Sequence, residues 1–327
     1  MKFGDSTTKF YLTASVIFIW LISLYIAINF QIVTQGQNPW NKSTLKFFKK
    51  NETENGTGIL WCERRRALDF MAEPSNATSN FAYILVGLIM IHFGIYDHLY
   101  NKDPEKHKKS LLIQNPGFSY AYGFAAWLLG VCSFFWHASN LKPHDHWDIQ
   151  SMHSVVIFPI FYLLFQLLYW IPKSGDILLV IHFGLKYYMF LFGLPVNSKT
   201  AMLYILVTLV GLSVVTFMIL YSKRNAQVLW FFGGIVGFVV GYGFWNLEKI
   251  PGWCFPDSLI QFHGLWHVFT ALAMLSLFWY FRSEVQRENV ESDETSLQTI
   301  SQSEGIDLLI EQIENISQIF DSDEEEN

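Results

Sequence analysis

Residues 118–171 read "FSYAYGFAAWLLGVCSFFWHASNLKPHDHWDIQSMHSVVIFPIFYLLFQLLYWI". Two largely apolar runs, 118–137 and 151–171, flank a short polar segment. Each run has the roughly 18 or more residues that a helix needs to cross about 30 Å of hydrocarbon. Every backbone donor and acceptor in lipid must be paired within its own segment, and the alternation of a β-barrel is absent. The runs therefore predict membrane-spanning helices.

The composition of the whole chain agrees with this prediction. Of the 327 residues, 51% are apolar and only 15% are charged, and the mean hydropathy is +0.25. We therefore expect an all-α integral membrane protein, with a lipid bilayer around it and no nucleic acid as a partner. Membrane-length windows recur about eight times, at 10–33, 80–97, 118–137, 151–171, 176–195, 201–221, 227–247 and 259–281.

Both ends of the chain differ from its centre. The first window follows a lysine-bearing lead, is long, and has no small-residue cleavage signal after it, so we expect a retained signal anchor. The tail carries fourteen acidic residues against one basic residue, which predicts a disordered cytosolic segment that is free to bind a partner. The expected divisions are an N-terminal lead and anchor helix at 1–34, a polar linker at 35–60, a seven-helix domain at 61–282 and the acidic tail at 283–327.

Loop charges and sequons predict the orientation. Lysine and arginine of the short loops gather on the side that holds both termini, so this side is expected to be cytosolic. The segment 34–79 carries N-x-[ST] sequons at Asn41, Asn51, Asn55 and Asn76, which are glycosylated only in a lumen or outside the cell. We therefore expect a protein of the endoplasmic reticulum, Golgi or plasma membrane, with this segment on the lumenal or extracellular face.

The chain has three cysteines. On this topology Cys62 and Cys254 both lie on the oxidising side, whereas Cys132 lies within a span. We expect a disulfide between Cys62 and Cys254, with two unpaired thiols as the alternative.

Ionisable side chains in spanning segments are costly and indicate functional sites. Ser133 and His137 are four residues apart near the end of one predicted helix, and His263 and His267 are four apart near the start of another, so each pair shares a face. Asp148 returns to the same level after the hairpin. Three neutral imidazoles suit zinc, and three protein ligands leave a position for a catalytic water. A nearby carboxylate can take the proton of that water.

Other readings of the histidines stay open. A single histidine on an apolar helix is usually a hydrogen-bonded packing residue. His144 and His146, in the predicted hairpin 138–147, are rival metal ligands. We expect structural roles for the remaining polar groups, His92, His98, His107, His182 and Lys186.

Several motifs together resemble one family. They are "WCE" (61–63), "AEPSNATSN" (72–80), "SFFWH" (133–137), Asp148, "FWN" (244–246) and "QFHGLWH" (261–267). In this order and at these spacings they are similar to the alkaline ceramidases, which are seven-helix zinc amidases of a superfamily that includes the progestin/adipoQ receptors. The resemblance covers about 60–282, so the first span would be an added helix.

The resemblance implies a role for each residue of the polar set. His137, His263 and His267 would bind zinc, Asp148 would be the general base on the zinc-bound water, and Ser133 would hydrogen-bond near the reacting carbonyl. It also implies a lumenal disulfide between the two cysteines named above.

The family's calcium site is matched only in part. Trp61, Glu63 and Glu73 correspond to it, but Leu60 and Arg65 stand where carboxylate or amide side chains are usual. Calcium prefers six to eight oxygen ligands. Either calcium binds despite these changes, or Arg65 takes its place by pairing with Glu73.

The implied reaction is hydrolysis of ceramide or a related N-acyl sphingoid base to a sphingoid base and a fatty acid. Two alternatives remain. One is a lipid-sensing protein resembling the progestin/adipoQ receptors, with weak or no turnover. The other is an ester hydrolase acting on a phospholipid or a GPI anchor.

Overall fold

The computed structural model describes residues 3–33, 61–66, 69–100, 110–193, 205, 208, 213, 216 and 224–286. Seven of the described helices are long and apolar enough to cross a membrane, including one near the N-terminus. The predicted all-α membrane fold is confirmed. Most of the window 201–221 and the whole acidic tail after 286 lie outside the described residues.

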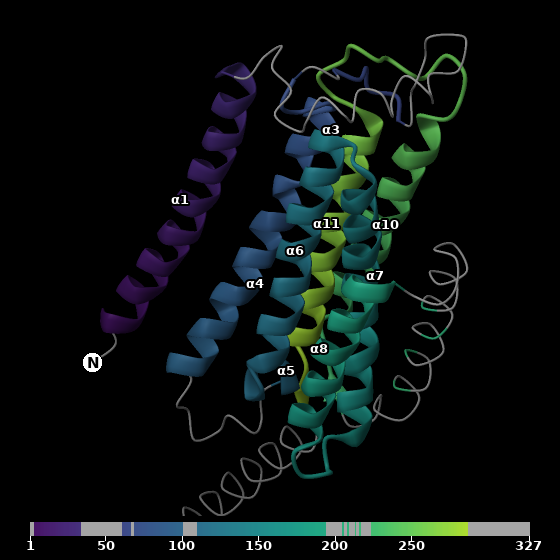
Figure 1. Ribbon diagram of the computed structural model, residues 1–327. Helices are drawn as coiled ribbons and strands as arrows, with labels where there is room; N and C mark the ends of the chain where they lie inside the picture. Colours follow the sequence, from purple (N-terminus) through teal and green to yellow (C-terminus); the bar gives the residue numbers. More distant parts are fainter. Residues whose placement is uncertain are drawn as a thin grey trace, which may run out of the picture.

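The helices run up and down side by side (Figure 1). Their bounds are α1 (Phe3–Val33), α3 (Pro74–Ser79), α4 (Phe81–Tyr100), α5 (Leu111–Gln114), α6 (Gly117–Ser139), α7 (Lys142–Leu168), α8 (Ser174–Phe192), α10 (Val228–Leu247) and α11 (Phe262–Arg282). Two two-residue strands, β1 (Arg224–Asn225) and β2 (Val285–Gln286), pair antiparallel.

The connection between α6 and α7 is shorter than predicted. Asn140 adopts a left-handed conformation with φ 54° and caps α6, and α7 already begins at Lys142 with Pro143 in its first turn. Asparagine tolerates this conformation, and proline is favoured at the start of a helix. The predicted hairpin 138–147 is therefore wrong, and Asp148 lies within α7.

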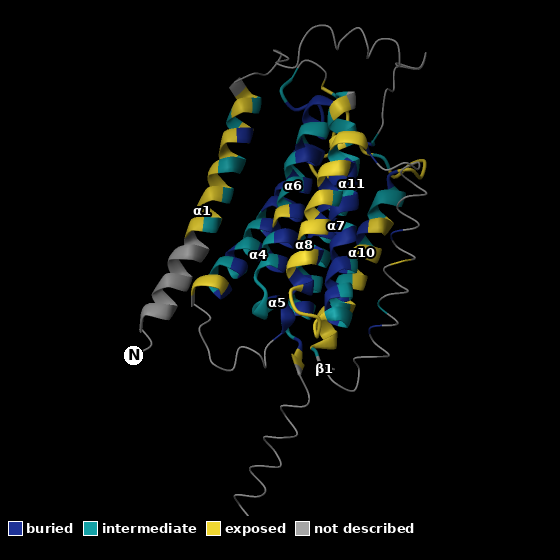
Figure 2. Cartoon of the chain, turned by 60° about the horizontal axis from the view of Figure 1, so that its bottom comes forward, coloured by how far each residue is buried: buried dark blue, intermediate teal, exposed yellow. Residues whose placement is uncertain are grey.

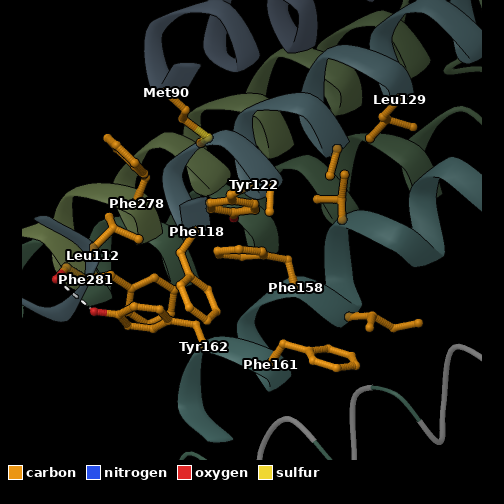
Figure 3. Close-up of a cluster of buried hydrophobic side chains, with 14 of the residues drawn as sticks. Met90, Leu112, Phe118, Tyr122, Leu129, Phe158, Phe161, Tyr162, Phe278 and Phe281 are labelled. Atoms are coloured by element: carbon orange, nitrogen blue, oxygen red, sulfur yellow. Dashed lines mark hydrogen bonds between the residues drawn. The ribbon is translucent and has the colours of Figure 1, made fainter. Parts of the chain in front are cut away.

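Aromatic side chains fill the centre of the bundle. Phe118 of α6 stacks on Phe165 of α7 with ring centroids 4.7 Å apart, and Tyr122 stacks on Phe158 at 4.2 Å. Figure 3 shows this cluster, to which α4, α5 and α11 also contribute. Because the rings are stacked between helices, they determine how far apart α6 and α7 lie.

Helices α4 and α6 approach so closely that only glycine fits at their contact. A Cβ atom on Gly87 would lie 2.5 Å from the backbone nitrogen of Trp127 and 2.6 Å from the Gly123 oxygen. Small residues at helix contacts are typical of membrane proteins, in which close packing replaces the hydrophobic effect.

The outer faces of the bundle are apolar. Large exposed side chains such as Val180 of α8 and Leu229 of α10 are 73% and 81% exposed. Figure 2 shows exposed residues along α1, α8 and α10 and buried residues in the middle of the bundle. Such a surface would be a liability in water and is suited to a bilayer.

A polar layer closes the end of the bundle where α4 and α11 finish. Arg282 donates to both carboxylate oxygens of Asp97, whose side chain is 1% exposed. Nearby, Glu284 accepts hydrogen bonds from Tyr162 and Gln166 of α7. These contacts connect the C-terminal end of α11 to α4 and α7.

Candidate metal centre

Three buried histidines meet at the opposite end of the bundle. His137 lies in the last turn of α6, and His263 and His267 lie one turn apart in the first two turns of α11. One nitrogen from each ring lies within 4.8 Å of the others. Because His263 and His267 lie on the same face of α11, as predicted, both rings can point toward α6.

The Nδ1 atom of each ring faces an oxygen. His137 Nδ1 donates to Glu73 Oε2 at 2.6 Å, and His267 Nδ1 lies 2.8 Å from Ser79 Oγ. His263 Nδ1 lies 3.4 Å from Oε1 of Glu248, the C-cap of α10, but the two atoms form no hydrogen bond. Hydrogen-bonded oxygens such as those of Glu73 and Ser79 hold the tautomer and orientation of metal-binding histidines.

The tautomers follow from these contacts. The Ser79 hydroxyl donates its single proton to the backbone oxygen of Asn76, so it accepts a hydrogen bond from His267 Nδ1. A carboxylate of Glu73 likewise only accepts. Protonation at Nδ1 leaves Nε2 with a free lone pair, and the buried His137 Nε2 has no hydrogen-bond partner among the described residues. The donor set therefore fits a metal ion that prefers neutral imidazole.

A segment before α4 lies against this end of α6. Ala72 N donates to Ala138 O at 2.8 Å, and Glu73 N donates to His137 O at 3.1 Å. These two backbone bonds bring the Glu73 side chain to His137. The position of one histidine is thus determined by both the backbone and the side chain of Glu73.

Glu63 holds the start of α3. Its two carboxylate oxygens accept from the backbone nitrogens of Ser75 and Asn76 at 2.7 and 2.8 Å. Burial raises the pKa of Glu63 to about 7, although the two backbone donors act in the opposite direction. Burial raises the pKa of Glu248 to about 7 in the same way.

The loop before α11 is joined to this segment. Trp61 stacks on His263 with ring centroids 4.0 Å apart, and the neighbouring Cys62 forms a disulfide with Cys254. The expected pairing of these cysteines is present, and Cys132 is a buried free thiol. The disulfide therefore lies directly beside the histidine cluster.

Asp148 and Ser133 lie together next to the cluster. Asp148 of α7 accepts a hydrogen bond from the Ser133 hydroxyl and interacts electrostatically with His137. Ser133 lies one helical turn before His137 on α6, which explains why both side chains are near the Asp148 carboxylate. The structure thus places the five predicted residues at one end of the bundle.

A comparison with protein-family models matches residues 54–303 to the Ceramidase family. The chain belongs to the ceramidase family. It is accordingly a membrane hydrolase that acts on the amide bond of ceramide. No curated protein matches the chain significantly. The matched region includes every residue of the metal centre and leaves α1 outside it.

The rival ligands of this ceramidase have other partners. His144 Nδ1 lies 2.5 Å from Ser139 Oγ, and His146 Nε2 donates to Phe190 O at 3.2 Å. Neither belongs to the potential metal-binding group found among the described residues. Both lie in the first turns of α7, where the predicted loop would have left them free to reach the metal.

The predicted calcium residues surround the histidines. Trp61 contacts a histidine ring, Glu63 binds backbone nitrogens, and Glu73 binds His137. Calcium binding by these three residues stays a prediction.

Sequence reasoning missed the oxygens behind the histidines. Glu73 corresponds to the family's calcium site, Ser79 belongs to the "AEPSNATSN" motif, and none of the motifs includes Glu248. Glu248 lies just beyond the end of an apolar span, where charged residues are ordinary, so the sequence carries no clear signal for it. The glycosylation candidates Asn41, Asn51 and Asn55 lie outside the described residues. Asn76 is fully buried, which leaves no room for a glycan on its side chain.

Proposed function

We propose that this ceramidase is a zinc-dependent amide hydrolase in which His137, His263 and His267 bind the metal. The observation that carries the proposal is the meeting of three buried imidazoles whose Nδ1 atoms face oxygens. Zinc accepts such a set with one coordination position open. Bound there, it would supply the Lewis acidity that polarises an amide carbonyl and makes a water molecule acidic.

Asp148 is assigned as the general base. Its carboxylate stands beside the cluster and is oriented by the Ser133 hydroxyl. It accepts a proton from the attacking water as the water oxygen bonds to the carbonyl carbon. When the carbon–nitrogen bond breaks, the protonated Asp148 returns that proton to the leaving amine, so that a fatty acid and a sphingoid base are released.

Ser133 has a second task in this scheme. Its hydroxyl is 2% exposed and is close to both Asp148 and the last turn of α6. We assign it to orient the base and to hydrogen-bond near the reacting carbonyl; because the hydroxyl has a single proton, it donates to the carbonyl only while it is not donating to Asp148. The aromatic side chains and lipid-facing helices provide apolar surroundings for the two hydrocarbon chains of the substrate.

We further propose that the metal centre faces a lumen or the cell exterior, in the endoplasmic reticulum, Golgi or plasma membrane. The disulfide beside His263 supports this orientation, because disulfides persist in oxidising compartments. The loop charges and sequons of the sequence point the same way. A cytosolic partner for the acidic tail, and the divisions at 34, 60 and 282, stay predictions.

Purified full-length protein and labelled ceramide test the function. Wild-type protein should release the fatty acid, and Asp148→Asn should lose this activity while it keeps its zinc, measured by elemental analysis. His263→Ala should lose both the zinc and the activity. Undiminished turnover by the Asp148→Asn protein would reject the base, and ligand binding without product in the wild type would favour the receptor alternative.

A further inference from the structure

Helix α1 lies outside the region that matches the family, yet one of its side chains reaches the metal-centre segment. Gln31, in its last turn, accepts a hydrogen bond from Met71 N at 2.5 Å through Oε1. Its Nε2 group donates to Asp69 Oδ2 at 3.3 Å and lies 3.5 Å from Met71 O. One side chain of α1 thus binds both polar groups of the Met71 backbone.

Met71 is placed two residues before Glu73 in a closed turn. Arg66 N donates to Ala72 O at 2.7 Å, and the Met71 side chain is 1% exposed. Ala72 and Glu73 then form their backbone bonds to the last turn of α6. A displacement of the Met71 backbone would therefore be passed directly to Glu73.

Apolar contacts hold this end of α1 in place. Phe30 packs edge-on against Phe70 with centroids 4.7 Å apart, and Ala27 is buried in a cluster with Met71. Farther along α1, Trp20 Nε1 donates to Phe81 O at 2.7 Å. The helix is thus attached to the family domain at two levels, of which only the upper one reaches the segment before α3 (Figure 1).

We propose that Gln31 is a positioning residue for the metal centre and acts through Glu73. The inference rests on the proposed metal site. A backbone N–H that is buried without an acceptor is costly, so the loss of Oε1 would shift the Met71 backbone toward another acceptor. The 2.6 Å contact between Glu73 and His137 depends on that backbone, and outer-shell contacts of this kind determine how tightly a metal is bound.

Zinc affinity of the full-length protein in detergent tests this role, with zinc ions and a competing chromophoric chelator as the probe. Gln31→Met keeps the length of the side chain and removes its hydrogen bonds. Changes to residues that hydrogen-bond a metal ligand weaken metal binding by about 10–100-fold. We expect a loss of zinc affinity at the lower end of this range, about tenfold, because Gln31 acts on the ligand His137 only through Glu73. Asn29→Ala is the matched control, since the hydrogen bond that Asn29 makes among the described residues is to Tyr25 O of its own helix.

A second pair of variants separates positioning from general docking of α1. Trp20→Phe removes the hydrogen bond to Phe81 O and should leave zinc affinity unchanged. Gln31→Met added to Glu73→Ala should weaken zinc binding no further than Glu73→Ala alone, because the two residues act in series. An independent tenfold loss in the double variant would overturn the proposed route through Glu73.

The remaining outcomes are also decisive. Wild-type affinity in the Gln31→Met protein, or an equal loss in the Trp20→Phe protein, would overturn the inference while leaving the metal site intact. Failure of the wild-type protein itself to bind zinc would reject the metal site and the inference with it. We expect zinc affinity to fall in the Gln31→Met protein and to stay at the wild-type value in the Asn29→Ala and Trp20→Phe proteins.

Discussion

Removal of the Glu73 carboxylate should weaken metal binding by about 10–100-fold. Glu73 is 2% exposed and its Oε2 lies 2.6 Å from His137 Nδ1. Glu73→Ala would leave a buried N–H group without its acceptor, at a cost of about 1–3 kcal/mol. Loss of an outer-shell partner typically weakens metal binding about 10–100-fold, which is about 1.4–2.8 kcal/mol, so both estimates agree.

Glu73→Gln should give a smaller loss. Its amide oxygen can still accept from His137, but a neutral acceptor contributes about 1 kcal/mol less than a charged one, or roughly a fivefold change in affinity. The assay is zinc competition against a chelator in detergent. The expected order of zinc affinity is wild type, Glu73→Gln, Glu73→Ala.

Glu284→Gln is the matched control. Glu284 is also buried and also accepts two side-chain hydrogen bonds, but at the opposite end of the bundle. It should lower the melting temperature and leave zinc affinity unchanged. Wild-type zinc affinity in Glu73→Ala, or an equal loss in Glu284→Gln, would refute the assigned role of Glu73.

Three further predictions concern stability and are checked by thermal unfolding in detergent, followed by circular dichroism. Gly87→Ala should destabilise the fold by about 1–3 kcal/mol, because the added Cβ atom would meet backbone atoms of α6. Gly184→Ala should not destabilise the fold, since no atom lies within 4 Å of the added Cβ atom. Equal melting temperatures of the two variants would reject the close contact. Cys254→Ser should remove the bond to Cys62 and cost about 2–4 kcal/mol, and a reductant should lower the melting temperature of the wild type but not of this variant. Asp97→Ala should cost about 3–5 kcal/mol by removing the carboxylate partner of Arg282, whose side chain is 11% exposed, and should leave zinc affinity unchanged. A loss of zinc affinity would contradict the separation of the two ends of the bundle.

The local pattern of the chain was sufficient to predict the spans and the histidine pairs. Length and apolarity alone determine whether a helix can cross a membrane, and a spacing of four residues places His263 and His267 on one face whatever surrounds them. The start of α7 was predicted wrongly because the polar residues after Pro143 resemble a loop. In the structure these residues form the first turns of α7. The chain reverses its direction between α6 and α7 at Asn140, which is in the left-handed conformation.

The sequence by itself therefore determined the membrane fold, the identity of the three histidines and the presence of a carboxylate near them. Only the tertiary structure decided what holds those histidines, because their oxygens come from distant parts of the chain. Glu73 is 64 residues from His137, and Ser79 is 188 residues from His267. Helical periodicity is a property of neighbouring residues and can be read from a sequence, whereas these contacts exist only once α3, α6, α10 and α11 are packed together. The hydrogen bond from Met71 to Gln31 depends on the docking of α1 in the same way.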